Sequence, residues 1–242
     1  HKYRVDARGS GDPKLLDKAV EILKDAKNPV IISGRGAVDA DGVDVVKQIA
    51  EHLTAPVAVS YMHNDAFPAN HPLALGPIGY MGSKAAMYTL QKADVVLAIG
   101  TRLSVFGTLP CYDIDYFPKN AKIIQIDINP RNIARTQPIE VGIIGDAKAA
   151  SEAIYQRLLD NVPKVENQSR MEEITKVKED WEQELIDLAM EEGNPINPRR
   201  ALLELTKALP ENTIISTDIG NVSSTANAYL KFNQTRRHIA AL

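Results

Sequence analysis

The hydrophobic positions between Pro13 and Asp160 alternate between two spacings. Leu16, Val20 and Leu23 recur at the interval of an amphipathic helix, and the next apolar residues form the continuous run Pro29–Ser33, which ends at a glycine. The same succession repeats along the chain. It predicts further helices at 43–53, 83–92 and 147–159, and further strands at 56–59, 94–99, 122–128 and 140–144.

Strands that alternate with helices predict a parallel sheet, because parallel neighbours need crossover connections. The predicted strands are continuous apolar runs, as expected when both faces of a sheet are buried. We therefore expect an α/β fold: a doubly wound parallel sheet in a Rossmann-like domain at 13–160. The polar residues 1–12 are expected to be a linker or entry segment.

The remainder of the chain has a different pattern. Residues 162–170 are polar and predict a linker, and 171–190 predict a long charged helix whose apolar stripe docks on the domain or on a partner. Helices are then expected at 197–209 and 222–232, with a strand at 213–217 between them. We interpret 161–194 as a linker and helix, and 195–242 as the first βα unit of a second α/β domain.

Composition narrows the function classes. The chain has 242 residues, 44% of them hydrophobic, and a net charge of -3, which excludes intrinsic disorder and disfavours a nucleic-acid partner. No apolar run approaches the ~20 residues of a membrane span. Cys111 is the single cysteine, so with no visible signal peptide a cytoplasmic location is expected. The chain starts at His1 and stops within an apolar segment, and we expect it to be a piece of a longer protein.

Glycines follow the predicted strands, where the carboxyl ends of a parallel sheet bind ligands. Each of them is also explained by the positive φ of a tight turn, and Asp39 stands where a dinucleotide fingerprint needs its third glycine. Arginines beside two of these glycines are candidate phosphate partners. Together these strand ends predict a nucleotide-sized cleft, with candidate residues Gly34, Arg35, Gly36, Gly79, Gly82, Gly100, Arg102 and Asp127 and the segment Ser60–Met62.

Other chemistry is not indicated. His52, His63, His71 and His238 lack the spacing of metal ligands, and Cys111 has no Cys or His nearby in the sequence, so no metal site is predicted. The sequence contains neither a Gly-x-Ser-x-Gly elbow nor a phosphate-binding Walker A loop, and no catalytic residue is assigned.

Several motifs, in order along the chain, resemble the thiamine-diphosphate-dependent enzymes of the acetolactate synthase and pyruvate oxidase superfamily. Within that group, loops 62–73 and 111–119 are most similar to the sulfoacetaldehyde acetyltransferases. The motifs are Pro29-Val-Ile-Ile-Ser-Gly-Arg-Gly-Ala, Gly79-Tyr-Met-Gly-Ser-Lys-Ala-Ala, Ala93-Asp-Val-Val-Leu-Ala-Ile-Gly-Thr-Arg, Ile123-Ile-Gln-Ile-Asp-Ile-Asn-Pro, Gly145-Asp-Ala, Asn197-Pro and Thr217-Asp-Ile-Gly-Asn.

The resemblance implies a three-domain enzyme, of which this chain carries the central domain and the start of the C-terminal one. The family places its catalytic glutamate in the first domain, and the Gly-Asp-Gly…Asn motif for Mg²⁺ and the diphosphate in the third. Neither is in this sequence. The thiamine diphosphate edge that remains maps onto Asp218, Gly220 and Asn221, so the chain by itself is expected to be inactive.

The resemblance also implies a reaction and its alternatives. It implies that sulfoacetaldehyde, a small-molecule substrate, and phosphate become acetyl phosphate and sulfite, in a full-length homodimer or homotetramer. The rival within the superfamily is an acetolactate synthase-like enzyme with FAD in the central cleft. That cleft holds ADP in another branch, and coenzyme A or no occupant also stays open. From a different class, the chain is a nucleotide-binding module without catalysis.

Overall fold

The computed structural model describes residues 8–240 and contains two separate sheets. The larger is a six-stranded sheet in the order β3-β2-β1-β4-β5-β6, parallel throughout. This confirms the predicted α/β fold with a doubly wound parallel sheet. Its strands are β1 (Pro29–Ser33), β2 (Val57–Val59), β3 (Ala74–Pro77), β4 (Val95–Ile99), β5 (Lys122–Asp127) and β6 (Val141–Ile144).

The centre of the sheet explains why its strands are continuous apolar runs. Every residue of β1 and β4 is buried, and the two strands pair in register from Pro29 with Val95 to Ser33 with Ile99. Helices cover both faces, which leaves no solvated face for an alternating pattern to serve. The covering helices are α1 (Pro13–Lys24), α2 (Arg35–Asp39), α3 (Val43–Leu53), α4 (Lys84–Gln91) and α5 (Ala147–Asn161).

Two elements of this domain escaped the hydrophobic pattern. The short helix α2 occupies the segment expected to be a glycine loop, and β3 adds an edge strand at Ala74–Pro77. A four-residue strand that contains both a glycine and a proline carries little β signal, and Pro77 is tolerated because it is the last residue of an edge strand. Asp146 is the N-cap of α5, since its carboxylate accepts from the amides of Lys148 and Ala149.

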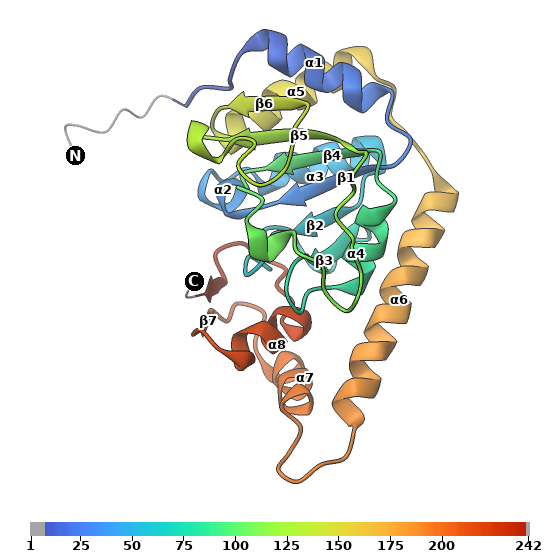
Figure 1. The fold of residues 1–242 in the computed structure, drawn as a ribbon, viewed down its shortest axis with the longest axis vertical. Helices are drawn as coiled ribbons and strands as arrows, with labels where there is room; N and C mark the ends of the chain where they lie inside the picture. Colours follow the sequence, from blue (N-terminus) through green and yellow to red (C-terminus); the bar gives the residue numbers. More distant parts are fainter. Residues whose placement is uncertain (1–7, 241–242) are drawn as a thin grey trace, which may run out of the picture.

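The long helix α6 (Gln168–Met190) runs down one side of the molecule, as Figure 1 shows. It begins before the expected start at Met171, because Asn167 caps it by accepting from the amide of Arg170. Its apolar stripe reaches two hydrophobic clusters: Ile174 is buried in that of the large sheet, while Trp181 and Leu185 belong to a second one. The expected docking face is therefore confirmed.

The last part of the chain, coloured from orange to dark red, lies below the large sheet in Figure 1. Its helices are α7 (Pro198–Ala208) and α8 (Asn221–Tyr229), and between them lies the predicted strand, β7 (Ile215–Thr217). A further strand that the pattern did not predict, β8 (His238–Ala240), pairs with β7 in parallel to form the second sheet. Within the described part of the chain, no helix is both long and apolar enough to cross a bilayer.

Candidate functional site

Three predicted glycines meet where the strand order of the large sheet reverses, between β1 and β4. The Gly36 amide donates to the Gly100 carbonyl oxygen at 2.8 Å, and the Gly34 amide donates to that of Ile99 at 3.0 Å. A Cβ on Gly34 would lie 2.6 Å from the Gly100 oxygen, and one on Gly36 2.7 Å from the Gly100 Cα. This close backbone contact is sufficient to require glycine at these positions. It also uses a backbone amide that was expected to bind a phosphate.

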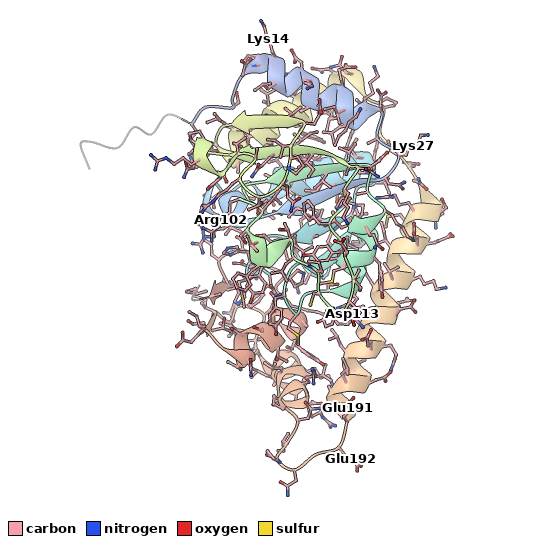
Figure 2. The ribbon with its side chains drawn as sticks, viewed as in Figure 1. Lys14, Lys27, Arg102, Asp113, Glu191 and Glu192 are labelled. Atoms are coloured by element: carbon pink, nitrogen blue, oxygen red, sulfur yellow. The ribbon has the colours of Figure 1, made fainter. Side chains whose placement is uncertain are left out.

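The two predicted phosphate-binding arginines flank this contact. Arg35 forms an exposed ion pair with Asp39, whose Oδ1 lies 2.7 Å from its Nε. Such a pair in water is weak and leaves the guanidinium available to a stronger anion. Arg102 is exposed at the carboxyl edge of the sheet, where it is labelled in Figure 2, and it has no hydrogen bond or ion pair within residues 8–240.

Asp127, at the end of β5, is buried and already holds hydrogen bonds. Its Oδ1 accepts from the Asn129 amide at 2.8 Å, and both carboxylate oxygens lie 3.1 Å from Asn132 Nδ2. These bonds hold the turn that follows the strand. The next residue, Ile128, is 71% exposed, so this strand end presents an apolar side chain, and Arg131 is exposed three residues later.

The predicted loop with Gly79 and Gly82 follows β3. Gly79 has a φ of 91°, and a Cβ there would lie 2.4 Å from the carbonyl oxygen of Phe106. A Cβ on Gly82 would lie 2.5 Å from the Pro77 oxygen. The loop is thus pressed onto the short 3-10 helix η1 (Val105–Gly107), where the Phe106 ring stacks on that of Tyr61 in the predicted Ser60–Met62 segment, at 6.1 Å.

The segment Asp218–Asn221 lies apart from these glycines, between β7 and α8. Gly220 has a φ of 144°, a conformation that residues with a side chain rarely adopt, and nothing lies within 4 Å of its absent Cβ. Asp218 Oδ1 accepts from the Ile219 amide at 2.7 Å. No side chain caps the N-terminus of α8, and its first turn has no acidic residue. The first amides of the helix are therefore left for an anion.

A group of side chains that the sequence analysis did not select joins the two sheets. Asn64 and Asp65, both at most 5% exposed, bond to α8 and to the start of β8. Burial lowers the pKa of the neighbouring His63 to about 4. Burial also lowers the pKa of His238, whose ring stacks on Phe232 at 5.2 Å. His63, Asn64 and Asp65 lie in the loop 62–73, and only the resemblance of that loop pointed to them.

A cavity of about 70 Å³ lies between β3, α6 and α8. Its walls are mainly apolar and include Phe67, Trp181 and Leu185, with Asn64 and Lys178 among the polar residues. None of the predicted site residues lines it. Among residues 8–240 there is no group of three or more His, Cys, Asp or Glu side chains placed to hold a metal ion.

Comparison with known proteins identifies what the chain is similar to. A family model for the central domain of thiamine pyrophosphate enzymes matches residues 16–154. The sulfoacetaldehyde acetyltransferase of Castellaniella defragrans is 47% identical over 97% of this chain and 42% of its own length. That of Alcaligenes xylosoxydans xylosoxydans is 45% identical, over 99% of this chain and 43% of its own.

A more distant relative is a probable acetolactate synthase large subunit from Methanocaldococcus jannaschii, 33% identical over 96% of this chain and 39% of its own length. The chain therefore spans about 42% of the length of the curated relatives that it matches at higher identity. The matched range 16–154 begins within α1 and ends within α5, and it contains all six strands of the large sheet.

Proposed function

Because the chain belongs to the thiamine pyrophosphate enzyme family through that family's central domain, we propose that it is part of a sulfoacetaldehyde acetyltransferase. The observation that carries this is the gap in similarity between two groups of relatives. Sulfoacetaldehyde acetyltransferases are 42% to 47% identical to the chain, and acetolactate synthases 31% to 33%. The proposed reaction converts sulfoacetaldehyde and phosphate into acetyl phosphate and sulfite.

Thiamine diphosphate, when bound, supplies the carbanion that adds to the aldehyde carbon. The first turn of α8 fits its diphosphate, because the turn has no capping side chain and no acidic residue, and the Asp218 carboxylate just before it accepts from the Ile219 amide. A helix N-terminus of this kind suits a diphosphate group, because its unpaired amides and the helix dipole both favour negative charge. We assign the diphosphate edge to Asp218, Gly220 and Asn221, with Gly220 giving the cofactor unobstructed access to the backbone.

The rest of the proposal concerns groups that this chain does not supply. The Mg²⁺ ligands and the catalytic glutamate belong, by resemblance, to motifs absent from the sequence. The chain therefore contributes orientation and an anion contact, and the full-length protein is proposed to act as a cytoplasmic homodimer or homotetramer. Size-exclusion chromatography with light scattering measures that assembly.

The test is a product assay on the full-length protein with thiamine diphosphate and Mg²⁺. With sulfoacetaldehyde and phosphate we expect sulfite and acetyl phosphate in equal amounts, and neither product when phosphate is left out. Pyruvate offered alone is the matched control. Formation of acetolactate from pyruvate, without sulfite release from sulfoacetaldehyde, would show an acetolactate synthase instead.

A second proposal concerns the carboxyl ends of β4 and β5. Arg102 is exposed after β4 without a partner in the described chain, and Ile128 is exposed directly after β5, the strand that pairs with β4. A guanidinium beside an apolar side chain matches a nucleotide, with phosphate on the first and base on the second. ADP, FAD and coenzyme A are the candidates. Each compound is titrated into the protein in a calorimeter. Binding should give heat that Arg102→Ala abolishes, and the absence of heat with all three compounds refutes the site.

A further inference from the structure

The loop between β2 and β3 is anchored in the core of the large sheet. Ser33, the fully buried last residue of β1, donates from Oγ to the Ala66 carbonyl oxygen at 2.8 Å, and its own carbonyl accepts from the Ser60 amide at 2.9 Å. Turn bonds from His63 to Ser60 and from Ala66 to His63 close the loop. The conformation of this loop is therefore fixed by its hydrogen bonds to the sheet and within the loop.

Asn64 reaches from this loop to the C-terminal end of α8. Its Nδ2 donates to the carbonyl oxygens of Asn227 at 2.8 Å and of Leu230 at 2.9 Å. The last carbonyls of a helix have no partner inside it, so Asn64 satisfies one that α8 leaves unpaired and another just beyond it. The two acceptors also fix which end of the amide is the nitrogen.

Asp65 holds the strand that pairs with β7. Its Oδ2 accepts from the backbone amides of Arg237 at 3.0 Å and His238 at 3.3 Å, at the start of β8. Two more bonds from the same loop follow the same route, from the Ala69 amide to the Phe232 carbonyl at 2.9 Å and from the Asn70 amide to Asn233 Oδ1 at 3.1 Å. The loop therefore holds α8, which begins at Asn221, and β8, the strand that pairs with β7.

We propose that Asn64 and Asp65 are positioning residues for the thiamine diphosphate edge, which they place relative to the large sheet through α8 and β8. The inference rests on the proposed function. α8 has nine residues and is roughly 13 Å long. Hydrogen bonds that hold its C-terminal end (the clamp) therefore also fix the direction of its N-terminal amides. β8 in turn sets the place of β7, whose end carries Asp218.

The test compares three variants with a control in the full-length protein. Asp65→Ala removes the acceptor of two amides, and Asn64→Asp turns two donated bonds into repulsion between oxygens. Each should weaken thiamine diphosphate binding about 10-fold, the equivalent of losing a charge-assisted or buried hydrogen bond. Asp65→Asn keeps an oxygen for both amides and should recover most of the affinity. Asn120→Asp, at an exposed position before β5 and outside the loop, should bind as the natural protein does.

Hydrogen exchange of residues 221–229 gives a readout that does not depend on the cofactor. Faster exchange there in Asn64→Asp and Asp65→Ala, but not in Asn120→Asp, supports the clamp. A melting temperature that falls while affinity and exchange in α8 stay unchanged assigns the two residues to bulk stability and overturns the proposal. If the natural protein binds no thiamine diphosphate, the proposed function fails, and the exchange data still decide whether the clamp exists.

Discussion

The amide nitrogen of Gly36 lies 2.8 Å from the carbonyl oxygen of Gly100, across the point where the strand order of the large sheet reverses. Gly100 has a φ of 60°, and a Cβ there would come within 2.5 Å of the Ala37 nitrogen. We expect Gly100→Ala to lower the free energy of unfolding by about 3 kcal/mol, through backbone strain and overlap together. Urea unfolding should show a lower midpoint with an unchanged slope.

Gly9→Ala is the control for that experiment. Gly9 has open space around the position of its Cβ and no positive φ. Its substitution should leave the free energy of unfolding unchanged within about 0.5 kcal/mol. A loss at position 100 no larger than the loss at position 9 would contradict the close approach of the two strand ends.

Arg170 attaches the N-terminal end of α6 to the large sheet. Its Nη2 donates to the Pro29 carbonyl at 2.9 Å and its Nη1 to Asn28 Oδ1 at 2.6 Å, with the side chain buried. Burial lowers the pKa of this guanidinium. Lysine cannot bridge two acceptors with the same fork, so Arg170→Lys should cost about 2 kcal/mol in chemical unfolding.

The exposed Arg131 provides the matched comparison, because its side chain has no hydrogen bond or ion pair within residues 8–240. Arg131→Lys should be neutral. Equal stability of the two lysine variants would show that the fork of Arg170 contributes nothing to stability.

The lowered pKa of His63 predicts that acid destabilises the fold. Burial lowers its pKa from 6.5 to about 4, against the opposing charge of Asp65 and in the presence of Arg35, His238 and Asp39. The unfolded chain takes up this proton near pH 6.5, whereas the folded one resists it to about pH 4. Stability is therefore complete above pH 6.5 and is lost as the pH falls towards 4.

Unfolding curves measured at several pH values check this. His63→Gln should flatten the fall between pH 6.5 and 4, and a smaller slope should remain because the pKa of His238 is lowered too. The same pH dependence in the glutamine variant and in the natural protein would exclude His63 as its source.

Gly220→Ala tests the diphosphate edge without a steric clash. Nothing lies within 4 Å of the added Cβ, but a φ of 144° strains any residue other than glycine by about 1–3 kcal/mol. We expect the backbone there to shift and thiamine diphosphate to bind about 10-fold more weakly in the full-length protein, as measured by calorimetry. Gly193→Ala, between α6 and α7, is the comparison and should keep its affinity, because Gly193 has no positive φ and its added Cβ would meet nothing nearer than 3.4 Å. Unchanged binding in both variants argues against this edge.

Much of the large sheet could be predicted from the sequence, because burial on both faces leaves a simple signal. The runs at Pro29–Ser33 and Val95–Ile99 are apolar nearly throughout, and each ends at a glycine. β3 gave no such signal, since Gly76 and Pro77 make up half of it. β8 was missed because the signal of a three-residue strand beside charged residues is too weak.

The candidate residues were predictable in position but not in what they contact. Glycine after a strand indicates either a ligand or a close backbone, and only coordinates show that Gly34 and Gly36 meet Gly100. Asp127 likewise bonds to its own turn. The roles of Asn64 and Asp65 were out of reach, because their partners lie more than 160 residues away in the sequence and no periodicity connects them.

The long helix α6 contributes to two hydrophobic clusters, through Ile174 at one end and Trp181 and Leu185 further along. A helix that packs into two hydrophobic clusters cannot separate from one of them without disturbing the other. The two sheets should therefore melt together, in a single calorimetric transition whose enthalpy reflects the whole described chain, although they share no strand.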